Sequence, residues 1–288
     1  MKIINKIQGF IELTRLDKPV GIYLLFWPSF IGLLLGVIDR GSIEFKNYFI
    51  LIIGTVLVRS CGCIINDIND YKFDRLVSRT KNRPLASGRM GMTEAWLYFI
   101  LLATLSLCLL FFVPLYTVYA SLVIAVFIMI YPLTKRFLKA PQFFLGITFG
   151  SGTIISFSLV SSDFSLSLLI LFIGTVLWII SFDTIYAFED IADDLKIGIN
   201  STPILWGDQA LNISKYLHLA FYVSLALIGF INKFSLFFLL ILIMLLGLYI
   251  HQRRLINNHQ YLDAFKFNNW IGMFASMGFV IEAFLIQS

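Results

Sequence analysis

Two groups of acidic residues stand out in a chain that is otherwise poor in charge. Eight of its 17 Asp and Glu residues fall within positions 66–74 and 183–194. Each group contains two aspartates spaced four apart, Asp70 with Asp74 and Asp190 with Asp194. Residues at that spacing lie on one face of an α-helix. The second pair follows the first at an offset of 120 residues, so the chain presents the same pattern twice.

Carboxylates held this close together repel one another unless a cation neutralises them. Mg²⁺ prefers oxygen ligands and commonly binds through one or two carboxylates together with substrate phosphates. Two facing aspartate pairs therefore predict Mg²⁺ ions that hold a diphosphate. A solvated helix end rich in Asp is the alternative. One such group alone would fit that alternative equally well, whereas two matched groups favour the metal site.

Basic residues accompany the acidic groups. Those that follow the first group or lie on another connection of the same side are Arg75, Arg79, Lys81, Arg83, Lys135 and Arg136. Phosphate oxygens that a metal leaves free need Arg or Lys donors. The pattern thus favours a Mg²⁺–diphosphate site, although the general bias of basic residues toward the cytoplasm explains some of them.

Arg59 is the only charged residue within the second long apolar run. It precedes Asn66 by seven residues, so both share a helix face and Arg59 lies about 10 Å deeper at 1.5 Å per residue. An arginine inside a membrane is costly and is by default a functional-site hypothesis. We interpret it as a clamp for an anionic group of a substrate that passes the metals. A structural partner for a buried carbonyl or for Asp183 is the alternative.

Long apolar helices must position these residues. The chain has 288 residues, of which 59% are hydrophobic and 14% charged, whereas soluble domains carry about 25% charged residues. Because a membrane span takes roughly 20 apolar residues, we predict an all-α polytopic membrane protein with nine transmembrane helices in one domain over residues 1–288. The apolar runs are 20–38, 48–65, 95–115, 116–133, 143–160, 164–182, 216–231, 234–250 and 270–286. Pro114 is expected to supply the turn between the third and fourth runs.

The distribution of basic residues predicts the orientation. Nine spans place 18 of the 22 Lys and Arg residues on the side of the N-terminus and only Arg40, Lys46 and Lys233 on the other. The positive-inside rule puts the basic side in the cytoplasm. No signal-peptide cleavage pattern precedes the first apolar run, so we expect a multi-pass protein of a bacterial inner membrane. Two long cytoplasmic connections, 66–94 and 183–215, hold most of the acidic residues, and long loops are usually functional.

Several motifs together resemble the UbiA-type membrane prenyltransferases. The two signatures are Asn-Asp-x-x-Asp-x-x-x-Asp at 66–74 and Tyr-Ala-x-x-Asp-x-x-x-Asp at 186–194. Further matches are Asp-Lys-Pro-Val-Gly at 17–21, Arg-Thr-Lys-Asn-Arg-Pro at 79–84 and Tyr-Pro-Leu-Thr-Lys-Arg at 131–136, within a stretch from about 15 to 207. Arg-Ser-Cys-Gly-Cys at 59–63 and the 131–136 stretch are most similar to the branch of the family that prenylates 4-hydroxybenzoate in the ubiquinone pathway.

The resemblance implies a nine-helix bundle in membrane lipid, Mg²⁺ as cofactor, a long polyprenyl diphosphate as donor, 4-hydroxybenzoate as acceptor and no nucleic acid partner. It implies that the metal ligands are Asp67, Asp70, Asp74, Asp190 and Asp194. It further implies that the substrate-binding residues are Arg15, Asn66, Arg83 and Lys135. Arg59 would hold the carboxylate of the acceptor, Tyr131 would shield an allylic cation, and Asp183 or Asp190 would take the phenolic proton. The apolar bundle would hold the prenyl tail.

Three rival functions remain open at this point. Another prenyltransferase of the same superfamily with a different aromatic acceptor is the nearest, because Arg59 argues for a small anionic acceptor without identifying it. A CDP-alcohol phosphotransferase would also be an Asp-rich membrane enzyme, but its Asp-Gly-x-x-Ala-Arg core is absent. A transporter should place its polar groups near the bilayer midplane, whereas the acidic groups here are predicted to lie at one face.

Overall fold

The computed structural model describes residues 2–40 and 44–287, and no β-strand occurs among them. Twelve α-helices and two short 3₁₀-helices follow one another in this part of the chain. In chain order they are α1 (Lys2–Thr14), α2 (Val20–Arg40), α3 (Phe45–Asp74), α4 (Met92–Leu109), η1 (Leu110–Phe112), α5 (Leu115–Thr134), α6 (Pro141–Phe157), α7 (Leu166–Ala187), α8 (Ile191–Ile197), α9 (Thr202–Trp206), η2 (Gly207–Gln209), α10 (Ala210–Ile231), α11 (Leu236–Asn257) and α12 (Tyr261–Gln287). The all-α prediction is confirmed.

Each of the nine predicted apolar runs forms the body of one long helix. Within the described residues, eight helical segments are long and apolar enough to cross a membrane, which makes the chain a multi-pass membrane protein. The run predicted at 143–160 is the exception, because α6 has only 17 residues and lies at the short end of the usual range for a span. The prediction of nine spans is therefore approximate. Pro114 lies at the start of α5 and separates it from η1, as expected.

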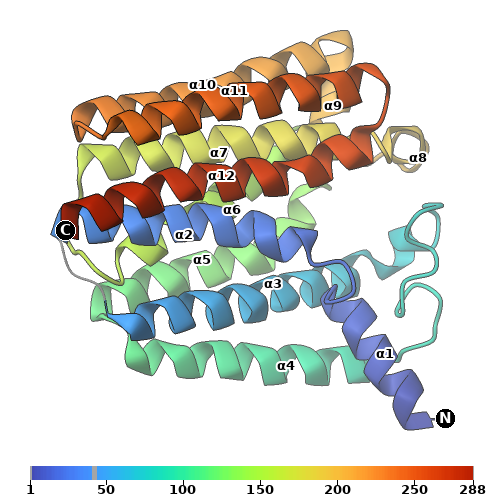
Figure 1. The fold of residues 1–288 in the computed structure, drawn as a ribbon. Coiled ribbons are helices and arrows are strands. Elements are labelled where there is room, and N and C mark those ends of the chain that lie inside the picture. Colours follow the sequence, from blue (N-terminus) through green and yellow to red (C-terminus); the bar gives the residue numbers. More distant parts are fainter. Residues whose placement is uncertain (1, 41–43, 288) are drawn as a thin grey trace.

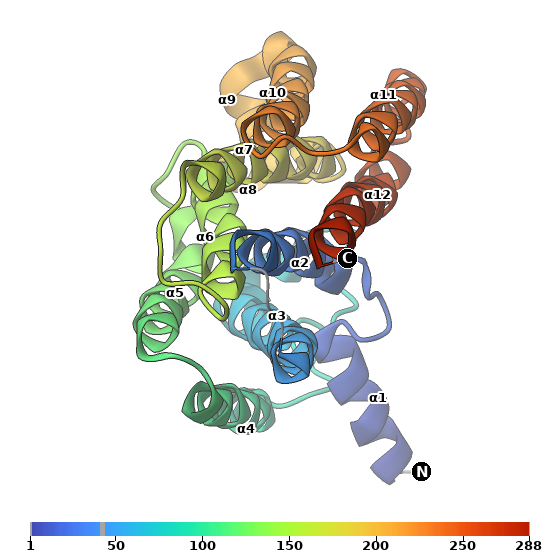
Figure 2. The same ribbon diagram turned by 60° about the vertical axis from the view of Figure 1, so that its left-hand side comes forward.

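The long helices lie side by side and form one bundle (Figure 1). Viewed nearly along the helix axes, α2 lies near the middle, with α3, α4, α5 and α6 on one side and α7, α10, α11 and α12 on the other (Figure 2). The largest apolar core centres on Trp178 of α7, which stacks on Phe221 of α10 at 4.7 Å between ring centroids. Backbones approach closely at Gly32, where an added Cβ would meet the carbonyl oxygen of Thr153 at 2.2 Å.

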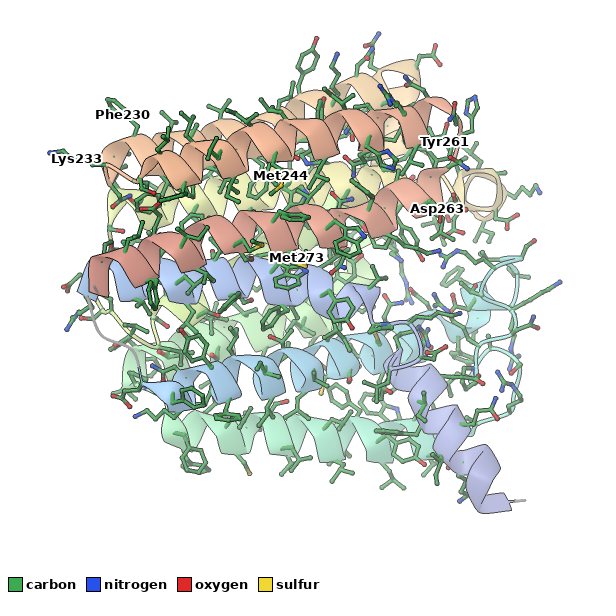
Figure 3. All side chains as sticks on the ribbon, in the orientation of Figure 1. Phe230, Lys233, Met244, Tyr261, Asp263 and Met273 are labelled. Atoms are coloured by element: carbon green, nitrogen blue, oxygen red, sulfur yellow. The ribbon has the colours of Figure 1, made fainter. Side chains whose placement is uncertain are left out.

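The two ends of the bundle differ in chemistry. Phe230 and Lys233 lie at one end, Tyr261 and Asp263 lie at the other, and Met244 and Met273 lie between them (Figure 3). The end that holds Tyr261 also carries α1, the 75–91 connection and α8 (Figure 1). Helix α3 is 30 residues long and continues to Asp74, so its acidic residues reach this polar end of the bundle.

The second acidic group differs from the expected continuous helix. The 186–194 signature does not lie on one uninterrupted helix, because α7 ends at Ala187 and α8 begins at Ile191. Tertiary contacts hold the turn between them. The Glu189 carboxylate accepts a hydrogen bond from the backbone of Leu262 at 2.9 Å, and the Asp190 carboxylate is bound by an arginine of the 75–91 connection.

Candidate active site

A cavity of about 1070 Å³ enters the bundle from its polar end. All twelve residues predicted to form the site contribute to its lining. Those on α3 are Arg59, Asn66, Asp67, Asp70 and Asp74. The others are Arg15 after α1, Arg83 in the 75–91 connection, Tyr131 and Lys135 at the end of α5, Asp183 of α7, and Asp190 and Asp194 at α8. The fold thus brings both acidic groups to the mouth of one cavity.

Asp67 is the most deeply buried of the carboxylates, with 1% of its surface exposed. The Nη2 atom of Arg15 lies 2.7 Å from both of its oxygens, and Nη1 of Arg83 lies 3.1 Å from Oδ1. Arg15 has a φ of 61°, a left-handed conformation that is uncommon for residues other than glycine. The prediction that Asp67 binds metal stays a prediction, since two arginines occupy its oxygens in this structure.

The 75–91 connection lies between the two acidic groups and binds both. Arg83 also donates to Asp74 at 2.8 Å. Arg79 donates through Nε to Asp190 at 2.8 Å and lies over the ring of Tyr186 at 4.9 Å. Burial disfavours the charge of Arg79, but its bonds to Asp190 raise the pKa of the guanidinium above the usual value.

Asp70 and Asp194 are among the carboxylates of the cavity that accept no hydrogen bond from the residues that the structure describes. Asp70 has only Lys135 nearby, with 3.8 Å between Nζ and Oδ2, and Asp194 makes no ion pair. Burial, together with the neighbouring Asp190, raises the pKa of Asp194 to about 6. Burial opposes the charge of Lys135, but Tyr131, Asp70 and Asp183 raise the pKa of its ammonium group.

These carboxylates suit a divalent cation that binds together with phosphate. In the described part of the chain, no group of three or more His, Cys, Asp or Glu side chains could hold a metal ion alone. Asp70 and Asp194 nevertheless have oxygens free, and Mg²⁺ commonly uses one or two carboxylates and completes its shell with water and phosphate oxygens. The arginines and Lys135 around them supply donors for the remaining phosphate oxygens.

Arg59 lies deeper in the cavity and has no anionic partner. Across residues 2–40 and 44–287 it forms no ion pair or hydrogen bond, and its buried Nε is unsatisfied. Its guanidinium lies over the ring of Phe149 at 5.4 Å and packs against Gly21, where an added Cβ would come within 2.7 Å of Nε and Nη2. An unpaired cation in such a place is costly, so the site favours an anionic ligand at Arg59.

Asp183 and Tyr131 lie between Arg59 and the carboxylates that are predicted to bind metal. Asp183 is within electrostatic range of Lys135 and Arg59, and its carboxylate accepts no hydrogen bond from any residue that the structure describes. Tyr131 lies near the same two cations and near Asp183. The alternative in which Asp183 pairs directly with Arg59 is wrong for this structure, because no ion pair joins them.

Below these polar residues the cavity is lined mainly by apolar side chains of α3, α4, α5 and α6. They include Leu51, Leu107, Leu122 and Leu145. Leu107 and Leu122 are 51% and 43% exposed. At the far end of the bundle the cavity extends to Leu159. This chamber fits a long apolar chain.

Two residues of the site were not among the predicted site residues, although Arg79 was one of the basic residues singled out beside the first acidic group. Arg79 belongs to the Arg-Thr-Lys-Asn-Arg-Pro stretch at 79–84, so the motif contained a signal for it. Gly21 belongs to the Asp-Lys-Pro-Val-Gly stretch at 17–21, but only its contact with Arg59 shows why a residue without a side chain is needed there.

Comparisons with known proteins agree with this geometry. The model of the UbiA prenyltransferase family matches residues 25–278. The chain is 36% identical over 280 residues to a 4-hydroxybenzoate octaprenyltransferase of Coxiella burnetii (strain CbuK_Q154). The aligned residues cover 96% of this chain and 97% of that protein. The apo structure of a UbiA homologue from Aeropyrum pernix K1 has the same fold, with a TM-score of 0.79, 23% identity and coverage of 91% and 97%. A UbiA homologue from Archaeoglobus fulgidus, bound to GPP and Mg²⁺, superposes with a TM-score of 0.71 at 18% identity, covering 97% of this chain and 99% of that one.

Proposed function

The chain belongs to the UbiA prenyltransferase family, and from this premise we propose that it transfers a polyprenyl group from polyprenyl diphosphate to a ring carbon of 4-hydroxybenzoate, a step of ubiquinone biosynthesis. Relatives such as the Coxiella burnetii protein carry the name 4-hydroxybenzoate octaprenyltransferase and match nearly the whole chain. Their name supports both the aromatic acid as acceptor and a long prenyl donor. The apolar chamber beneath the carboxylates supports the long donor independently.

The observation that carries the choice of acceptor is the unpaired guanidinium of Arg59 inside the cavity. A carboxylate matches the planar fork of arginine with two parallel hydrogen bonds. The carboxylate of 4-hydroxybenzoate would neutralise Arg59, and the ring would then point toward Asp183 and the polar mouth. An acceptor without an acidic group would leave the cation unpaired.

The donor diphosphate would lie at the mouth of the cavity. We propose that Arg15, Arg83 and Lys135 bind its oxygens and that Asp70, Asp74, Asp190 and Asp194 hold divalent cations, Mg²⁺ in particular, with Asp67 positioning the two arginines or joining the metal ligands. Bound Mg²⁺ would supply charge stabilisation to the departing diphosphate. Asn66 faces the same region and would contact the substrates.

In the proposed reaction the allylic C–O bond breaks and its electron pair leaves with the diphosphate. The ring carbon next to the phenol oxygen forms the new C–C bond. The proton on that carbon then passes to the released diphosphate, which restores the aromatic ring, and the phenol oxygen regains the proton held by the base. Asp183 accepts no hydrogen bond, whereas Asp190 is bound by Arg79, so we favour Asp183 as the base that draws the phenolic proton. Tyr131 would shield the allylic cation with its ring.

The orientation follows from charge. The polar end of the bundle carries most Lys and Arg residues, and we propose that it faces the cytoplasm of a bacterium, with the protein in the inner membrane. Both substrates and the metal would then meet at the cytoplasmic surface, while the prenyl tail would enter from the lipid.

A direct assay tests this proposal. Purified protein in detergent would receive Mg²⁺, octaprenyl diphosphate and either 4-hydroxybenzoate or the neutral phenol 4-hydroxybenzyl alcohol, and prenylated products would be measured by mass spectrometry. We expect product from the acid and at least about tenfold less from the alcohol, because a charge-assisted hydrogen bond of about 1.5–3 kcal/mol is lost. Equal use of both phenols would overturn the assigned acceptor, and no product from either phenol would overturn the reaction.

A further inference from the structure

Gln142, in the first turn of α6, is a buried amide in the wall of the active-site cavity. The residue lines the cavity and is 5% exposed. Its Oε1 atom accepts a hydrogen bond from the backbone N–H of Thr202 at 3.0 Å. A backbone N–H can only donate, so this contact fixes the amide with its oxygen toward α9 and its NH₂ group on the other side.

The NH₂ group of Gln142 faces the cavity without a partner. In the described part of the chain, Nε2 donates no hydrogen bond, yet it keeps accessible surface, unlike the sealed and unpaired Nε atom of Arg59. That surface opens on the cavity, because the residue is otherwise buried. A buried donor without an acceptor is costly, so a ligand that fills the cavity at this level is expected to accept a hydrogen bond from Gln142.

Packing places Gln142 at the level of Asp183 on the neighbouring helix α7. Thr202 joins the two helices: its backbone N–H binds Gln142, and its hydroxyl lies 2.8 Å from the hydroxyl of Thr184. Asp183 is the residue before Thr184 and lines the same cavity. Gln142 and Asp183 therefore border the same part of the cavity from two adjacent helices.

The unpaired groups of these two residues are complementary. The carboxylate of Asp183 accepts no hydrogen bond from the described residues, and the amide of Gln142 donates none to them. A phenolic hydroxyl can donate one hydrogen bond and accept another. One phenol oxygen between them would thus donate to Asp183 and accept from Gln142, and both groups would be satisfied together.

The spacing between Gln142 and Arg59 fits an acid whose hydroxyl lies opposite its carboxylate. The guanidinium of Arg59 lies over the ring of Phe149, seven residues after Gln142 on α6. Seven residues span about 10 Å at 1.5 Å per residue and return to nearly the same helix face. An aromatic acid with its carboxylate on Arg59 would extend along this face and bring a para hydroxyl to the level of Gln142.

We propose that the amide of Gln142 donates a hydrogen bond to the phenol oxygen of the acceptor and is a further catalytic residue. This inference rests on the proposed function and identifies the residue that recognises the para hydroxyl. As Asp183 draws the phenolic proton, negative charge develops on the oxygen. Gln142 keeps its own protons and stabilises that charge through its N–H. Because Thr202 fixes the amide beforehand, no reorganisation is needed during the reaction.

Binding of two acids tests this role without turnover. Calorimetry of the detergent-purified protein, with Mg²⁺ and inorganic pyrophosphate present, would measure Kd for 4-hydroxybenzoate and for benzoate, which lacks only the hydroxyl. Wild type should prefer the hydroxy acid about tenfold or more. Gln142→Leu should lose most of that preference and bind benzoate and pyrophosphate as before. Gln209→Leu, which makes the same change at an exposed position in η2, should behave as wild type.

Turnover provides a second measurement that a structural role would not explain. With octaprenyl diphosphate as donor, Gln142→Leu should lower kcat about a hundredfold, the effect of removing one donor to a developing oxyanion, and leave the KM for the donor near its original value. The defect should shrink with 3-fluoro-4-hydroxybenzoate, because its more acidic phenol needs less stabilisation.

The contrary outcomes are distinct. Equal weakening of both acids by Gln142→Leu, with the hydroxyl preference intact, would show a structural glutamine and overturn the proposal. Weaker binding of pyrophosphate with that preference intact would place Gln142 in the donor site instead. If wild type binds neither acid, the acceptor assigned under the proposed function is itself wrong, and the role of Gln142 falls with it.

Discussion

The guanidinium of Arg59 packs directly against the backbone of Gly21, so that α2 and α3 meet at the deepest charge of the cavity. A Cβ on residue 21 would lie 2.7 Å from Nε and Nη2 of Arg59. Carbon and nitrogen atoms do not approach this closely without displacement. The glycine therefore sets the position of the arginine that we assign to the acceptor.

Gly21→Ala should displace Arg59 without unfolding the protein, because the clash involves the end of a flexible side chain. We expect the KM for 4-hydroxybenzoate to rise about tenfold, equivalent to about 1.4 kcal/mol, while the KM for the prenyl diphosphate changes little. Gly247→Ala is the control, since an added Cβ there meets nothing within 4 Å. An unchanged KM for the acid in folded Gly21→Ala would separate Gly21 from acceptor binding.

Removal of the arginine itself should have a larger effect. Arg59→Ala is expected to weaken use of the aromatic acid by roughly ten- to several-hundred-fold, because the charge-assisted bond is lost. Arg59→Lys should restore only part of the activity, since an ammonium lacks the bidentate fork. Steady-state KM values for both substrates provide the measurement. If the KM for the prenyl diphosphate rises and that for the acid does not, Arg59 belongs to the donor site.

Metal dependence can be tested by chelation and by single substitutions. EDTA should abolish turnover, and Mg²⁺ should restore it. Asp70→Asn and Asp190→Asn should each reduce kcat about a hundredfold or more, because several kcal/mol of charge stabilisation is lost. Asp163→Asn is the control, since Asp163 is exposed at the opposite end of the bundle, where it contacts Arg40 at 3.5 Å and Ser162 at 3.3 Å. Undiminished turnover in one variant would remove that aspartate from the metal site.

Arg79 joins the 75–91 connection to α8 and should act on the donor. Arg79→Ala is expected to raise the KM for prenyl diphosphate several-fold to about tenfold, because a charge-assisted bond at a partly exposed site is lost, and to leave the KM for the acid near its original value. Lys81→Ala, which removes a neighbouring exposed charge, should have little effect. Equal effects of the two substitutions would show that only the net charge of the connection matters.

The topology predicts that Ser87 and Ser162 are accessible from opposite sides of the membrane. Both residues are exposed and lie in connections between helices. Single cysteines at these positions would be labelled in intact cells and in inverted vesicles with a membrane-impermeant maleimide. Cys108 is exposed whereas Cys61 and Cys63 are buried, so a Cys108→Ser background is suitable. We expect labelling of position 162 from outside and of position 87 from the cytoplasmic side. Labelling of both from one side would contradict the arrangement of spans.

Much of the fold could be predicted from the sequence because lipid imposes a local rule. Every backbone polar group in the bilayer must be satisfied within its own helix, so each apolar run became a long helix, and Pro114 separated two of them. The positions of Arg59, Asn66 and Asp70 on one helix followed from the 3.6-residue period alone. The count of nine spans was only approximate, because α6 has 17 residues and lies at the short end of the range for a span.

Only the tertiary structure decided how these residues pair. The contacts of Arg15 with Asp67, Arg79 with Asp190 and Arg59 with Gly21 join segments that are far apart in the chain, and no local period specifies them. The break after Ala187 likewise depends on contacts from other elements. Helices follow from local chemistry, whereas pairing between helices depends on how their surfaces pack in three dimensions.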